Sequence, residues 1–201
     1  MTIYGFKSRF QNLIRPICKF IVVFGVTPNQ VTLTTMILSF VVGWIVWMFD
    51  GASWTLSLLP FVLLARMTLN ALDGMLAREY GMQSARGVMM NELGDVLSDA
   101  ALYLPLAVIP GVCSPLIVVA VVLASVSEMA GVLAAQVGTG RRYDGPMGKS
   151  DRALAFGLLA AALSGGVMHH GLLNIVLAGI NALLVVTIFR RAGKALQANA
   201  A

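Results

Sequence analysis

Two short polar stretches interrupt otherwise apolar segments and carry the residue types that could perform chemistry. Asn70 and Asp73 lie in the first stretch, and Asn91 and Asp95 lie in the second. Carboxylate and amide oxygens are ligands that hard divalent cations accept in proteins, and substrate phosphates often complete the coordination shell. The pattern therefore indicates a site for a divalent cation together with a phosphorylated substrate.

The spacing of these four residues predicts that their side chains converge. Asn70 and Asp73 are three residues apart and Asn91 and Asp95 four, so each pair lies on one face of its helix. Residues 79–87 form a short link that holds the two helix ends together. Ionisable groups inside an apolar helix bundle are costly, which makes such a cluster a functional-site candidate. Simple hydrogen bonding between helices is the alternative explanation.

Apolar helices must position this cluster. The chain has 201 residues, of which 58% are hydrophobic and 11% charged, whereas a soluble domain has about 25% charged residues. This composition predicts an all-α, polytopic membrane protein with one domain over residues 1–201. Its parts are an amphipathic juxtamembrane helix at the membrane surface over 1–26 and a six-helix bundle over 27–201. The six predicted transmembrane spans are 31–49, 55–77, 90–109, 114–137, 152–169 and 171–190.

The placement of basic residues predicts the topology. Of the 14 Lys and Arg residues, Arg66 alone lies well inside a predicted span, and the others lie in or beside four regions. These are the N-terminal segment, the second and fourth links, and the C-terminal tail. The positive-inside rule then puts both termini and the polar cluster on the cytoplasmic side of a bacterial-type inner membrane. The net charge of +5 is assigned to topology and anionic membrane lipids, and no nucleic-acid partner is expected.

The two polar stretches also match a specific pattern, D-x-x-D-G-x-x-A-R followed after eight residues by G-x-x-x-D-x-x-x-D. The matching residues are Asp73, Gly74, Ala77, Arg78, Gly87 and Asp95. In this pattern the chain resembles the class I CDP-alcohol phosphatidyltransferase family. Asn70 and Asn91 stand where the family has its first and third Asp, so the chain is identified as a member of an atypical subgroup.

The resemblance implies a reaction. A CDP-activated lipid, usually CDP-diacylglycerol, donates its phosphatidyl group to an alcohol acceptor and releases CMP. It also implies one or two Mg²⁺ or Mn²⁺ ions, with Asp95 acting in addition as the general base. The implied metal ligands are Asp73, Asn70, Asn91 and Asp95, and the implied CDP-binding residues are Gly74, Ala77, Arg78 and Gly87. Because Asn adds no negative charge, weaker metal binding is expected than with four carboxylates.

Two features leave alternatives open. A rival alignment of the pattern uses Asp95 and Asp99 as its last two Asp, with Asn91 in the Gly position. Arg66 lies one turn from Asn70 and is expected either to bind the pyrophosphate of the donor or to pair with Glu128.

The fourth link ends in Gly148-Lys149-Ser150-Asp151-Arg152. Family members whose acceptor carries a phosphate have a similar Gly-Lys-x-x-Arg segment, so Lys149 and Arg152 are expected to bind an anionic acceptor such as a phosphorylated polyol. An ordinary basic cytoplasmic link is the alternative.

Small residues at four-residue intervals follow in the fifth predicted span. They are Ala153, Gly157, Ala161 and Gly165, and they favour either packing within the chain or a homodimer face. For the whole protein, two alternatives to the enzyme are a catalytically impaired lipid- or nucleotide-binding relative and a small-molecule transporter. The transporter is disfavoured because the polar groups cluster at the membrane edge instead of its midplane.

Overall fold

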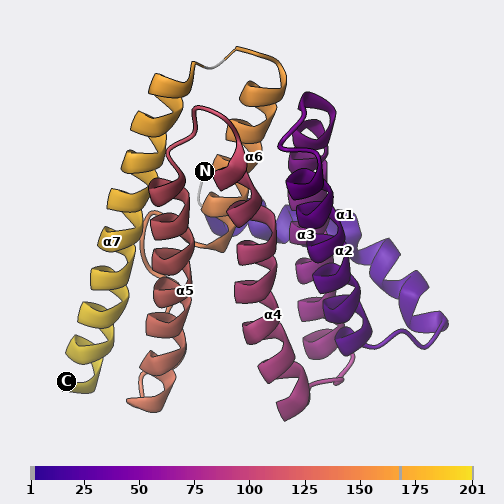
Figure 1. The fold of residues 1–201 in the computed structure, drawn as a ribbon. Coiled ribbons are helices and arrows are strands. Elements are labelled where there is room, and N and C mark those ends of the chain that lie inside the picture. Colours follow the sequence, from indigo (N-terminus) through magenta and orange to yellow (C-terminus); the bar gives the residue numbers. More distant parts are fainter. Residues whose placement is uncertain (1–2, 168, 201) are drawn as a thin grey trace.

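The structure is a computed structural model that describes residues 3–167 and 169–200. In this part of the chain every regular element is helical (Figure 1). The elements are α1 (Ile3–Val23), α2 (Pro28–Met48), α3 (Ser53–Glu79), α4 (Ala85–Tyr103), the 3₁₀-helix η1 (Leu104–Val108), α5 (Ser114–Gln136), α6 (Lys149–Ser164) and α7 (His170–Ala200). The all-α prediction is confirmed.

Four of the described helices, α2, α3, α5 and α7, are long and apolar enough to cross a membrane. The other two helices predicted to span, α4 and α6, are shorter and have a higher proportion of charged residues. The apolar sequence of α4 contains three acidic residues, Glu92, Asp95 and Asp99. Helix α6 has only 16 residues and begins with Lys149. The count of six spans therefore stays a prediction.

Local capping and glycine account for the places where helices depart from their predicted limits. The predicted span 90–109 is instead a helix that begins at Ala85, because the Ser84 hydroxyl accepts a hydrogen bond from the Gly87 amide at 3.0 Å. Its last residues form η1, which has a proline in its first turn. The predicted span 152–169 runs from Lys149 to Ser164 and ends where Gly166 takes a φ of +64°.

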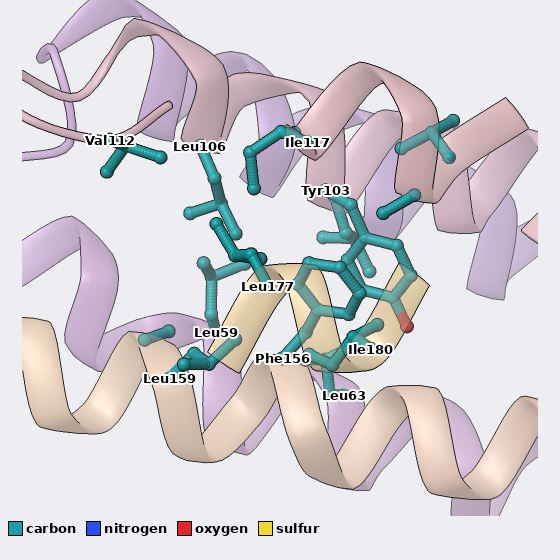
Figure 2. Close-up of a cluster of buried hydrophobic side chains, with 14 of the residues drawn as sticks. Leu59, Leu63, Tyr103, Leu106, Val112, Ile117, Phe156, Leu159, Leu177 and Ile180 are labelled. Atoms are coloured by element: carbon teal, nitrogen blue, oxygen red, sulfur yellow. The ribbon is translucent and has the colours of Figure 1, made fainter. Parts of the chain in front are cut away.

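The helices pack around an apolar core. In the ribbon, α2 lies against α3 and α4, α3 against α6, and α5 against α7 (Figure 1). Figure 2 shows the core side chains, among them the rings of Tyr103 and Phe156, which stack with centroids 4.0 Å apart. This stack joins α4 to α6, so the two charged helices are held together by apolar contact as well as by charge.

Glycine allows two close helix contacts. A Cβ added at Gly43 would lie 1.9 Å from the Ala101 carbonyl oxygen, so α2 approaches α4 more closely than any side chain would permit. Gly157 lies against Pro60 of α3, whose Cα would be 3.6 Å from an added Cβ. Of the two expected uses of the small residues in α6, packing within the chain is the one found at Gly157.

The N-terminal helix α1 docks on the bundle. Ile14 and Cys18 are buried in a small apolar cluster with Leu72 and Leu76 of α3, while Leu13 on the opposite side is 74% exposed. The helix thus has one face on the protein and one apolar face directed outward. This arrangement is consistent with the predicted juxtamembrane position, which stays a prediction.

Gly43→Ala should separate α2 from α4 and lower the free energy of unfolding by about 1–3 kcal/mol, the usual cost of overpacking. Gly179→Ala in α7 is the matched control, because nothing lies within 4 Å of an added Cβ there. Thermal unfolding in detergent measures both variants. Equal midpoints for the two would show that the close contact at Gly43 does not constrain the fold.

Candidate active site

A polar cavity of about 350 Å³ opens where α3 ends and α4 begins. Its walls come from the start of α2, the end of α3, the start of α4 and the link between α5 and α6. Six of the residues expected at the site line it, namely Asp73, Gly74, Ala77, Arg78, Gly87 and Asn91. Residues of both polar stretches therefore line one cavity, whereas Asn70 and Asp95 are not among its lining residues.

Two glycines in the cavity wall lie close to neighbouring polar side chains. A Cβ at Gly87 would lie 2.8 Å from the Asn29 side-chain oxygen and 3.0 Å from the Ser84 hydroxyl. A Cβ at Gly74 would lie 3.0 Å from the Arg78 guanidinium. A larger residue at Gly87 would displace the Asn29 side-chain amide and the Ser84 hydroxyl that caps α4.

The two carboxylates at the site have different partners. Asp73 is buried and accepts a hydrogen bond from the Thr32 hydroxyl at 2.9 Å. Among the described residues it takes part in no ion pair. Asp95 forms an ion pair with the Lys149 ammonium, and an Arg66 nitrogen lies 3.7 Å from the same carboxylate oxygen. The negative charge of Asp95 is thus compensated by side chains, whereas that of Asp73 is not.

Arg66 has a structural environment. It is 1% exposed, forms an ion pair with Asp99 and donates a hydrogen bond to the Asp95 backbone oxygen at 2.8 Å. The expected pairing of Arg66 with Glu128 is wrong, because Glu128 is taken by other arginines and Asp99 lies nearer. Arg66 does not line the cavity.

Asp99 belongs to a buried ion-pair network and also lies away from the cavity lining. One of its oxygens pairs with Arg66 and the other accepts from Arg152 Nε at 2.9 Å. Arg152 is fully buried and its guanidinium also pairs with Glu128 at 2.9 Å. Arg191 of α7 adds a contact to Glu128 at 3.4 Å. The network therefore connects α3, α4, α5, α6 and α7.

The link between α5 and α6 folds back along the bundle. The Arg142 amide donates to the Gly131 carbonyl at 3.0 Å, and the Met147 amide donates to the Thr187 hydroxyl at 3.0 Å. Near the surface, Asp144 accepts a hydrogen bond from Lys194, which holds the pKa of this carboxyl below its usual range. These contacts bring the start of α6, and with it Lys149, to the middle of the site.

Several cavity residues were not expected from the sequence. Arg141 bridges Glu92 at 2.7 Å and Glu128 at 2.9 Å, and its guanidinium lies 4.6 Å from the ring centre of Tyr143. Arg141, Glu92 and Tyr143 line the cavity beside Thr32. Thr32 could have been expected near the site from its position one turn after the capped start of α2. Nothing in the sequence pairs the link with α4.

Oxygen donors that could bind a divalent cation come from carboxylate and amide side chains. The described residues contain no group of three or more His, Cys, Asp or Glu side chains that could hold a metal ion. The carboxylate of Asp73 has no cationic partner within this part of the chain, and the Asn70 side-chain nitrogen is buried without a hydrogen-bond partner. A buried amide left unsatisfied indicates a group meant for a ligand, since rotation exchanges its nitrogen and oxygen. The Asp73 carboxylate and the amides of Asn70 and Asn91 are oxygen ligands that a divalent ion could share with a phosphate.

A bundle of apolar helices with oxygen-rich and basic side chains in one cavity is the architecture of a membrane protein with a site for a polar ligand. Residues 25–191 match the CDP-alcohol phosphatidyltransferase family profile, and the chain belongs to that family. It is a transferase of this kind.

Known proteins similar to this chain agree with that assignment. The inner membrane protein YnbA of Escherichia coli K12 is 43% identical over 164 residues, which cover 82% of this chain and 81% of YnbA. The crystal structure of Mycobacterium tuberculosis phosphatidylinositol phosphate synthase (PgsA1) with CDP-DAG bound superposes with a TM-score of 0.75. Its identity is 19%, and the match covers 90% of this chain and 92% of that one. The apo form of the same enzyme matches with a TM-score of 0.72 and 20% identity, over 89% of this chain and 93% of that one. At this level of identity the structural match shows a shared fold.

Arg152→Met should lower the free energy of unfolding by about 3 kcal/mol, because Asp99 and Glu128 each lose one of their buried ion pairs. Arg190→Met, at an exposed position of α7, is the matched control. Thermal unfolding in detergent measures the difference. A midpoint for Arg152→Met as high as that of the control would show that the buried network does not stabilise the fold.

Proposed function

We propose that the protein transfers a phosphatidyl group from a CDP-diacylglycerol-type lipid to an alcohol acceptor and releases CMP. The observation that carries the proposal is the convergence of the two polar stretches on one cavity, with Asp73 in its wall and Asp95 within Coulombic range of Asp73. The relative PgsA1, whose fold is the same, has been crystallised with CDP-DAG and, separately, with manganese and citrate.

Binding of the donor is assigned to the cavity wall. Gly74 and Gly87 let the backbone approach the nucleotide closely, Ala77 leaves room beside them, and Arg78 offers a positive charge to the pyrophosphate. A divalent Mg²⁺ or Mn²⁺ ion, when bound, would neutralise charge on the phosphoryl oxygens. Asp73, with the amide oxygens of Asn70 and Asn91, would hold it.

Asp95 is assigned as the general base. Its carboxylate accepts the proton of the acceptor hydroxyl, and the hydroxyl oxygen forms a bond to the phosphorus that carries the diacylglycerol. The bond from that phosphorus to the CMP oxygen breaks, so CMP leaves as the other product. Asp99 does not suit this role, because arginines bind both its oxygens, and we therefore prefer the alignment that ends at Asp95.

Arg66 and Arg152 are assigned to positioning, since both are buried in ion pairs and neither lines the cavity. A phosphorylated polyol is a candidate acceptor. Lys149 is the cation proposed to bind it, because its side chain is not fully buried. The protein is proposed to lie in the inner membrane, with both termini and the cavity on the cytoplasmic side. Residues 1–26 would lie at the interface and 27–201 would form the bundle. A homodimer is also proposed, although Gly157 of α6 packs within the chain.

The test is release of CMP from CDP-diacylglycerol by purified protein with Mg²⁺ or Mn²⁺, measured across a panel of alcohols. Asp95→Asn should reduce the rate by about 10²–10⁴-fold, the usual contribution of a general base. Asp50→Asn is the matched control, because Asp50 lies at the α2–α3 turn, at the opposite end of α2 from the cavity.

A rate for Asp95→Asn equal to that of the control would contradict the role of Asp95. Absence of both turnover and exchange of labelled CMP, with every acceptor, would favour the catalytically impaired relative instead.

A further inference from the structure

The ammonium group of Lys149 lies where a cation is needed beside Asp95. It contacts one oxygen of the Asp95 carboxylate, whose side chain is 9% exposed, while the Lys149 side chain is 21% exposed. A buried carboxylate without a counter-charge is strongly destabilising, so some cation has to occupy this position. In this chain the cation is part of the protein.

The start of α6 holds Lys149 in place. The Gly148 amide donates to the Asp151 carboxylate at 2.9 Å, which caps the helix at the residue before Lys149. One turn later, Arg152 is anchored by Asp99 and Glu128. Because both sides of Lys149 are fixed, only its flexible stem has to be ordered for the ammonium to reach Asp95.

The charges around the cavity complete the argument. Asp73 and Asp95 supply two negative charges and Lys149 one positive charge, while Asn70 and Asn91 supply none. Asp73 and Asn91 line the cavity, and Asp95 follows Asn91 by one turn of α4, so the Lys149–Asp95 pair lies beside the cavity wall. The other charged residues in the cavity wall are Arg78 and the pair of Glu92 with Arg141. Asp73 is therefore the carboxylate of the described cavity wall that takes part in no ion pair, which suits a single divalent ion shared with a pyrophosphate. A second ion next to Asp95 would have to approach the ammonium of Lys149 and the guanidinium of Arg66.

We infer that the Lys149 ammonium takes the place of a second divalent cation beside Asp95, so that the protein binds one divalent ion on the Asp73 side. The inference rests on the proposed function for the presence of the first ion. It gives the two Asn residues and Lys149 a common explanation. The loss of carboxylates and the presence of an internal cation compensate each other.

Counting bound Mn²⁺ tests the inference without any need for turnover. The purified protein in detergent is titrated with Mn²⁺ alone, and free Mn²⁺ is measured by electron paramagnetic resonance. The wild-type protein should bind one ion, and Lys149→Met should bind a second ion or bind the first at least tenfold more tightly. Lys149→Arg, which keeps the cation, should behave as wild type. Lys194→Met is the matched control, because that lysine pairs with Asp144 in the α5–α6 link.

A second pair of variants guards against misfolding of Lys149→Met. Asn91→Asp should tighten binding while the count stays at one ion, because Lys149 is still in place. The double variant Asn91→Asp with Lys149→Met should bind two ions.

The inference would be overturned if Lys149→Met left both the number of bound ions and the affinity unchanged. It would also be overturned if the wild type or Asn91→Asp bound two ions. If Lys149 serves only the acceptor, its removal would change the KM for the acceptor and leave the Mn²⁺ titration unaltered. Failure to release CMP would contradict the proposed function and leave the Mn²⁺ count to be judged separately.

Discussion

A carboxylate buried in an apolar helix bundle is costly unless a positive charge lies nearby, and this constraint organises the structure around Asp99 and Glu128. Asp99 and Glu128 are met by arginines from α3, α6 and α7, which reach them across the core. Each of these ion pairs forms only when the helices are at the correct height and rotation. The network therefore sets the relative positions of the helices that surround the cavity.

The charged residues divide into two groups with different surroundings. Arg66 and Arg152 are buried in ion pairs and do not line the cavity. Asp73 lies in the cavity wall and has one hydroxyl partner. Asp95 and Lys149 lie between the groups and are paired to each other, with Asp95 buried and Lys149 partly exposed. A site of this kind keeps its reactive carboxylates at a defined position because the neighbouring charges cannot move.

Much of the fold and part of the site could be predicted from local patterns. Spacing by three and four residues places Asn70 with Asp73 and Asn91 with Asp95, and a short link joins the two pairs, so their convergence needed no structure. The limits of α4 and α6 were less predictable, because charged residues lower the apparent hydropathy at their starts. The partner of Arg66 was predicted wrongly, since an arginine side chain reaches several neighbouring helices and hydropathy does not report which one.

The sequence by itself determined the helical class, the family and the two stretches that form the cavity. These depend on composition and on spacing along one or two adjacent helices, where the backbone geometry is known in advance. The tertiary structure alone decided that the α5–α6 link folds back, that Arg141 enters the cavity wall and that Lys149 pairs with Asp95. These contacts join residues more than forty positions apart, except along the link itself, and depend on how the helices pack. The physical reason is that the choice of a charge partner is made by distance in space, which only the packed bundle defines.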